Sequence, residues 1–89
     1  MTIHYSKQFK KDYKRMTKQG RDIALLDGIL HRLIDGQALS PQQKDHRLQG
    51  KWGDCRECHL QPDWLLIYRK GENFISFERT GTHSELLRH

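Results

Sequence analysis

The apolar run WLLIY (Trp64–Tyr68) decides the fold of this chain. Such a run between polar turns is typical of a strand that lies in the middle of a sheet. Two further strand-like runs flank it, at residues 55–60 and 73–79, and Gly71 marks a tight turn into the second of them. Pro62 cannot donate a ladder hydrogen bond, so it marks a break just before the central strand. The second half of the chain therefore predicts three neighbouring strands.

Apolar residues recur at helical spacing in the first half of the chain. Ser6 is a suitable N-cap for a first helix that ends at Gly20. A second helix is predicted from about residue 22 to residue 35, with Gly36 as its stop. The two helices would form a hairpin with one shared apolar face. Before them, residues 2–5 alternate briefly and predict a short edge strand.

These elements predict the fold class α+β, with an N-terminal helical hairpin packed on one face of a small, mainly antiparallel sheet. The connector at residues 37–43 is polar, and residues 82–87 predict one terminal helical turn. A chain of 89 residues has the length of one domain, so residues 1–89 are expected to fold as a single domain.

The chain is basic, and its positive charge is concentrated near the N-terminus. Sixteen Lys and Arg stand against eleven Asp and Glu, which gives a formal net charge of +5. The cations clustered on the first predicted helix are Lys7, Lys10, Lys11, Lys14, Arg15 and Lys18. Such a cluster favours a polyanionic partner, with nucleic acid as the leading candidate. The alternative is an ordinary solvated helix face.

The sequence Cys55-Arg56-Glu57-Cys58-His59 spells C-x-x-C-H, the attachment signature of c-type haem. The motif falls within a predicted strand, where Cys55 and Cys58 would point to opposite sides of the sheet. That geometry argues against zinc, and haem attachment would require export. The N-terminus lacks the apolar core of a signal peptide, and no run is long enough to cross a bilayer. We expect no metal, no cofactor, no membrane contact and a cytoplasmic location.

Residues suited to proton transfer gather in three short clusters in the second half of the chain. They are KDHRLQG (Lys44–Gly50), ECHLQPDW (Glu57–Trp64) and FERTGTH (Phe77–His83). Each cluster lies beside a strand end or a tight turn, where a small scaffold can aim side chains at a substrate. Histidines together with an acid and an arginine indicate acid–base chemistry on an anionic substrate.

The three clusters, in this order and spacing, resemble the YafQ branch of the RelE-type toxins, bacterial messenger-RNA interferases of type II toxin–antitoxin systems. The matching stretches are KDHRLQG, CHLQPDWLLIY and FERTGTHSELL. The resemblance implies a RelE-like microbial RNase fold and an endoribonuclease that cuts messenger RNA in the A site of the 70S ribosome. It also implies a cognate antitoxin that binds this chain and contacts operator DNA. This chain would then meet DNA only as part of the toxin–antitoxin complex. The basic surface predicts an acidic inhibitory segment on that antitoxin.

The resemblance carries over five active-site residues, which are His46, His59, Asp63, Arg79 and His83. In metal-independent cleavage the RNA 2′-hydroxyl attacks the adjacent phosphate. His83 is expected to be the principal proton-transfer group, with Asp63 and His59 as the second acid–base element. Arg79 would stabilise the charged transition state, and His46 would share proton transfer or hold the phosphate. Which histidine is the acid and which is the base stays open.

Three further positions are expected to contact RNA or the ribosome, namely Lys44, Trp64 and Leu87. Trp64 suits the core better than a functional site, and both interpretations are open. Leu87 stands where the family pattern has a phenylalanine, so the ring that could stack on a base is missing there. Two other functions remain possible. One is a non-catalytic RNA- or ribosome-binding module, and the other is a degenerate toxin acting mainly in operon autoregulation.

Overall fold

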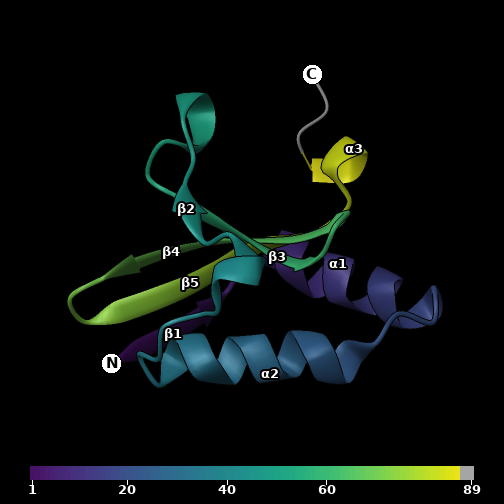
Figure 1. Cartoon of the computed structure of the whole chain (residues 1–89), viewed down its shortest axis with the longest axis horizontal. Helices are drawn as coiled ribbons and strands as arrows, with labels where there is room; N and C mark the ends of the chain where they lie inside the picture. Colours follow the sequence, from purple (N-terminus) through teal and green to yellow (C-terminus); the bar gives the residue numbers. More distant parts are fainter. Residues whose placement is uncertain (87–89) are drawn as a thin grey trace.

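The computed structural model describes residues 1–86, and a five-stranded sheet forms its middle layer (Figure 1). The strands are β1 (Thr2–Tyr5), β2 (His46–Arg47), β3 (Arg56–Gln61), β4 (Trp64–Gly71) and β5 (Phe74–Gly81). Their spatial order is β1-β5-β4-β3-β2, so the WLLIY run lies in the middle strand. Only β1 and β5 pair in parallel, which confirms the predicted, mainly antiparallel sheet.

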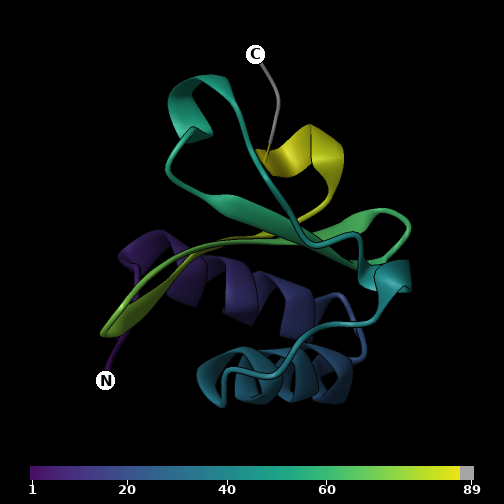
Figure 2. The same cartoon turned by 60° about the vertical axis from the view of Figure 1, so that its left-hand side comes forward.

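The predicted helical hairpin is formed by α1 (Lys7–Lys18) and α2 (Ile23–Ile34), which together cover one face of the sheet (Figures 1 and 2). The Ser6 hydroxyl accepts a hydrogen bond from the Phe9 N–H at 2.9 Å, as expected of the predicted N-cap. Asp22 caps α2 in the same way, since its Oδ1 accepts from the Leu25 N–H at 3.3 Å. No helix within residues 1–86 is long and apolar enough to cross a membrane.

The larger core lies between the helices and the sheet. Trp64, Tyr68 and Phe77 are fully buried there against Met16 and Leu26. Burial of one such large side chain contributes about 1.5–3 kcal/mol, so these few residues supply much of the stability of a small domain. Alternate residues of β4 point to the other face of the sheet and form a smaller core.

The two cysteines lie in different cores, as the strand geometry predicted. Cys58 packs in the larger core, while Cys55 packs with Leu65 and Ile67 in the smaller one. Burial is the main cause that raises the pKa of Cys55 to about 11 and the pKa of Cys58 to about 12. Both are therefore protonated thiols at neutral pH and act as small core residues.

Two segments rise from the sheet face that the helix pair leaves open (Figure 1). One is the arm formed by β2 and the short 3-10 helix η2 (Gly50–Trp52), and the other is α3 (His83–Leu86). The terminal turn was predicted, whereas β2, η2 and the 3-10 helix η1 (Pro41–Gln43) were not. Elements of two or three residues are too short for hydrophobic periodicity to reveal them.

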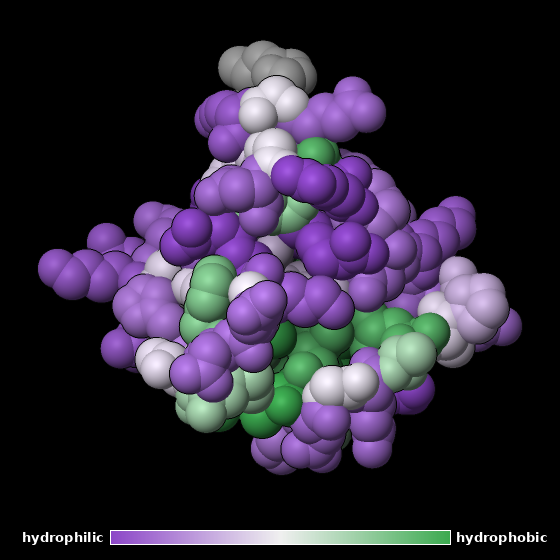
Figure 3. Space-filling model, turned by 90° about the vertical axis from the view of Figure 1, so that its left-hand side faces the viewer, coloured by the Kyte–Doolittle hydropathy of each residue, from purple (hydrophilic) through white to green (hydrophobic). Residues whose placement is uncertain are grey.

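Apolar side chains also reach the surface at the outer edge of the sheet. Ile3, Tyr5 and Phe74, from β1 and β5, are 40%, 37% and 39% exposed. Figure 3 shows an apolar area on this side of the molecule, surrounded by hydrophilic residues. An apolar area of this kind at a sheet edge suits contact with another chain.

Candidate active site

Strand pairing brings the polar clusters together on the open face of the sheet (Figure 2). His46 lies opposite Glu57, Glu57 opposite Ile67, and Ile67 opposite Arg79. Paired residues point to the same face, so the side chains of His46, Glu57 and Ile67 form one row across β2, β3 and β4. The register shifts between Ile67 and Tyr68, and the Arg79 guanidinium is directed at Asp12 of α1. His59 lies two residues beyond Glu57 and therefore shares that face.

Asp63 orients His83 through two hydrogen bonds. The His83 backbone N–H donates to Asp63 Oδ1 at 3.1 Å, and His83 Nδ1 lies 2.8 Å from the same oxygen. The hydrogen bond from the His83 ring is the main cause that lowers the pKa of the Asp63 carboxyl. Asp63 is therefore a carboxylate acceptor, and we assign the ring proton to Nδ1. His83 Nε2 stays free to take up or release a proton.

Glu57 lies between the other two histidines, and the sequence analysis did not identify it as a site residue. Its side chain is almost fully buried, and its Oε1 lies 3.0 Å from His59 Nε2 and 3.9 Å from His46 Nε2. The Nδ1 of His46 lies 2.6 Å from the Lys44 carbonyl oxygen, which leaves Nε2 directed at Glu57. The i, i+2 spacing of Glu57 and His59 within a predicted strand was the signal that could have revealed this contact.

The three rings of His46, His59 and His83 form one continuous group, which we call the histidine group. The ring centroids of His46 and His59 are 6.4 Å apart, and those of His59 and His83 are 5.7 Å apart. Ligand atoms of Glu57, His59 and His83 all lie within 4.8 Å of one another. The sequence predicted no metal site, yet imidazole and carboxylate at this separation could hold a transition-metal ion.

Arg79 of β5 is held by a buried carboxylate. Its Nε and Nη2 donate to Asp12 at 2.7 and 3.2 Å, and Asp12 is fully buried beneath it in α1. Two strand spacings, roughly 10 Å, separate the backbones of Arg79 and Glu57. Arg79 thus lies at a distance from the histidine group with its guanidinium directed at α1, and its contact with phosphate stays a prediction.

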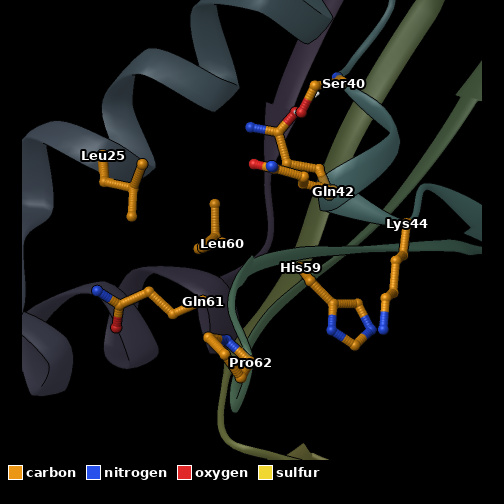
Figure 4. A pocket seen from close by; sticks show the side chains of 9 residues that line it. Leu25, Ser40, Gln42, Lys44, His59, Leu60, Gln61 and Pro62 are labelled. Atoms are coloured by element: carbon orange, nitrogen blue, oxygen red, sulfur yellow. Dashed lines mark hydrogen bonds between the residues drawn. The ribbon is translucent and has the colours of Figure 1, made fainter.

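The helix α1, which carries the predicted basic cluster, lies on the other side of the sheet from β2 and α3 (Figure 2). Exposed on α1 are Lys7, Lys10, Lys11, Lys14 and Lys18. Their contact with RNA or the ribosome stays a prediction, and from this side they would meet a different part of the partner. Lys44, by contrast, lies beside His59 on the site side (Figure 4).

Arg15 has a structural role, and its expected contact with RNA stays a prediction, since its side chain is 33% exposed. Its guanidinium pairs with Asp12 at 2.8 Å and with Glu85 at 3.0 Å, and it donates to the Thr80 carbonyl oxygen at 3.3 Å. These contacts join α1 to the end of β5 and to α3.

Trp64 is a core residue, and its expected contact with RNA is wrong. The side chain is fully buried, and its indole N–H donates to Thr80 Oγ1 at 2.9 Å. A ring without exposed surface cannot stack on a nucleobase. Leu87, the other position considered for base contact, lies outside the described residues.

Comparison with known proteins shows the family of this chain. Residues 1–88 match the family described as bacterial toxin of type II toxin–antitoxin system, YafQ. The mRNA interferase toxin YafQ of Escherichia coli K12 is 42% identical over 86 residues, which cover 96% of this chain and 94% of the relative.

Solved structures share the fold along nearly the whole chain. The toxin in the crystal structure of the E. coli DinJ–YafQ complex has a TM-score of 0.90 and 42% identity, with 94% of each chain covered. A metal-bound toxin from Helicobacter pylori has a TM-score of 0.88 and 46% identity, with 97% of this chain and 98% of that chain covered. The chain therefore belongs to the YafQ family of bacterial toxins of type II toxin–antitoxin systems.

Proposed function

We propose that this chain, an endoribonuclease of the YafQ family, cuts messenger RNA in the ribosomal A site by metal-independent acid–base catalysis and so inhibits translation. The histidine group with its two carboxylates, Glu57 and Asp63, is the observation that carries the proposal. Imidazole gives and takes protons near neutral pH, and each such transfer contributes about 10²–10⁴-fold to a rate. An open sheet face leaves room for a polymeric substrate.

In the proposed reaction the RNA supplies its own nucleophile. The 2′-oxygen forms a bond to phosphorus while the bond from phosphorus to the 5′-oxygen breaks, which leaves a 2′,3′-cyclic phosphate and a free 5′-hydroxyl. One ring takes the 2′ proton and a second, protonated ring gives a proton to the 5′-oxygen. His83 and His59 are adjacent and suit this pair of roles. Lys44 or Arg79 would stabilise the added negative charge on the phosphate.

The place of the α1 lysines supports the proposed dependence on the ribosome. The exposed lysines of α1 lie on the opposite side, where ribosomal RNA could hold them. Binding in the A site would present the codon at a fixed geometry, which raises the effective concentration of the scissile phosphate. The proposed place of action is the bacterial cytoplasm, where ribosomes translate.

The proposal is tested by primer extension on a defined messenger, both free and held in purified ribosomes. We expect cuts within the A-site codon when ribosomes are present and little cutting of the free messenger. Ribosome binding without any cut would instead favour the non-catalytic binding module or the degenerate toxin. Equal cutting of free and ribosome-bound messenger would contradict the proposed dependence on the ribosome.

Replacement of Glu57 by Gln is expected to slow cleavage by roughly 10- to 100-fold. A hydrogen bond to a charged group contributes about 1.5–3 kcal/mol, and the substitution removes the charge while keeping the shape. Glu57 acts as a positioning residue for His59 and His46, so the pH profile of cleavage should shift as well. The control is Glu72→Gln in the exposed turn before β5. An unchanged rate and an unchanged pH profile would remove Glu57 from the site.

Added Cu²⁺ or Zn²⁺ is expected to inhibit cleavage. The ligand atoms of Glu57, His59 and His83 lie close enough to bind one ion, which would occupy the lone pairs that proton transfer needs. Calorimetry should show that about one ion binds per chain. This binding should be lost in His59→Ala. It should be retained in the control His31→Ala, because His31 is exposed on α2. Protein stripped of metal that cuts only after the ion is restored would support a metal-dependent nuclease instead.

The proposed partner besides the ribosome is a cognate antitoxin, by analogy with the DinJ–YafQ complex of E. coli. The edge of the sheet offers apolar Ile3, Tyr5 and Phe74, and the lysines of α1 lie next to β1 along the chain. An antitoxin segment that carries acidic and apolar residues would complement this surface. Operator DNA would be contacted through the antitoxin only.

A further inference from the structure

A hollow of about 500 Å³ opens beside His59, at the margin of the histidine group (Figure 4). It lies between η1, the last residues of β3 and the first turn of α2. The residues that line it are Leu25, Ser40, Gln42, Gln43, Lys44, His59, Leu60, Gln61 and Pro62. Its size falls within the roughly 300–1,000 Å³ of sites that take small ligands. The proposed reaction uses only two of these residues, His59 and Lys44.

The edge of β3 continues beside this hollow past the end of β2. The Leu48 N–H donates to the Cys55 carbonyl oxygen at 3.0 Å, so every second residue of the β3 segment directs its backbone groups at β2. Glu57, opposite His46, is the last residue in this ladder. His59 is the next in the series, and its N–H and C=O point beyond the end of β2.

Lys44 prevents the ladder from reaching His59. In a continued ladder Lys44 would lie opposite His59, but it adopts a left-handed conformation with φ of 48°. Its N–H donates to the Pro41 carbonyl oxygen at 3.1 Å, and its own carbonyl oxygen accepts from His46 Nδ1 at 2.6 Å. Among the residues 1–86 that the structure describes, no strand takes the place opposite His59.

Gln43 adds a donor whose orientation is fixed. Its Oε1 accepts two hydrogen bonds from Ser40, from the backbone N–H at 2.8 Å and from the hydroxyl at 3.1 Å. Because both donors occupy the oxygen, the Nε2 end of the amide is directed away from Ser40 and can only donate. A hydrogen-bond donor with a fixed orientation in the wall of a hollow is typical of a site that recognises the polar groups of a ligand.

The hollow has an apolar end and a charged end. Leu25 and Leu60 point toward each other at one end, with the amide of Gln42 above Leu60 (Figure 4). At the other end the Lys44 side chain runs beside the ring of His59. A ligand seated here would therefore place a flat apolar body among the leucines and an anionic group between Lys44 and His59.

We propose that this hollow binds one nucleobase of the substrate RNA, the base next to the scissile phosphate. The faces of the base would lie against Leu25 and Leu60, and its edge would meet Gln43 Nε2 and the backbone groups of His59. Lys44 would then contact the phosphate attached to that nucleotide. The inference rests on the proposed function and adds to it a part that sets codon preference.

The test is Gln43→Glu, which keeps the oxygen that Ser40 needs and removes the donor. The control is Gln37→Glu, which adds the same charge at an exposed position outside the hollow. Cleavage rates are measured on ribosomes programmed with a set of A-site codons that differ in one base at a time. For the wild type we expect a preference at one codon position. Gln43→Glu should reduce that preference by roughly tenfold, and Gln37→Glu should leave it unchanged.

The outcomes separate this inference from the proposed function. Cutting by the wild type with the same preference in Gln43→Glu overturns the base-binding hollow and leaves the ribonuclease intact. Equal cutting of all codons by the wild type also overturns it. No cutting by the wild type overturns the proposed function itself. If Gln43→Glu keeps its preference but binds the antitoxin more weakly, the hollow belongs to the antitoxin interface and the inference is wrong.

Discussion

Replacement of His83 by Ala is expected to lower the cleavage of ribosome-bound messenger by about 10²–10⁴-fold, the range of one lost proton transfer. The Asp63 carboxylate fixes the His83 ring by a 2.8 Å contact at Nδ1 and leaves Nε2 free. That nitrogen lies next to the His59 ring, which is the second candidate for proton transfer. The measurement is the single-turnover rate of cutting within the A-site codon, followed by primer extension.

The matched control is His31→Ala, which removes an exposed histidine from α2 on the other side of the sheet. It should cut at the wild-type rate. Asp63→Asn should produce a smaller loss than His83→Ala, because the ring remains but its orientation is no longer fixed. If His83→Ala cut as fast as the wild type, the principal proton transfer would belong to His59 or His46. His83→Ala and Asp63→Asn should both have melting temperatures close to that of the wild type, since neither side chain is buried.

Replacement of Asp12 by Ala is expected to cost about 3 kcal/mol of the free energy of unfolding. Asp12 is fully buried and accepts hydrogen bonds from Arg79, Arg15 and the Thr80 N–H. Removal of one partner of a buried ion pair costs about 3–5 kcal/mol, because the remaining charge is left without compensation. We expect a loss of stability at the lower end of this range, because water can reach the Arg79 and Arg15 side chains, which are 21% and 33% exposed. Urea denaturation at neutral pH measures the difference.

Asp35→Ala, an exposed acid just after α2, is the control and should change stability by less than about 0.5 kcal/mol. Asp12→Asn keeps one acceptor without the charge and should lie between Asp12→Ala and the wild type. A loss below 1 kcal/mol in Asp12→Ala would show that the network contributes little. Cleavage should also fall in both Asp12 variants at temperatures where they are folded, because Arg79 loses its anchor.

The Asp12 network also predicts how stability depends on pH. Burial alone would raise the pKa of Asp12, but the hydrogen bonds from Arg79, Arg15 and Thr80 outweigh it and lower the pKa below its ordinary value. A lowered pKa in the folded state means that the stabilisation is present above about pH 4, the ordinary value for Asp, and is lost as the pH falls through the lowered value. The difference in stability between wild type and Asp12→Ala should therefore shrink in acid.

Local sequence patterns were sufficient for the longer elements of this fold. The WLLIY run, the Ser6 cap and the glycine stops depend on residues within a few positions of one another, so they can be read before any tertiary contact exists. The separation of Cys55 and Cys58 onto different faces follows from strand alternation alone. For the same reason the sequence could name most residues of the candidate site, since each of the three clusters carries its histidine or acid as a local motif.

The tertiary structure decided what these residues contact. Glu57 became part of the histidine group because β2 pairs with β3 in a register that places His46 opposite it. Trp64 lies in the core, although sequence alone left it available to RNA, and Arg15 belongs to the Asp12 network. The hollow beside His59 exists because Lys44 ends a ladder of two residue pairs. Such contacts join residues far apart in the chain, and their geometry is set by strand register and helix packing, which no local pattern specifies.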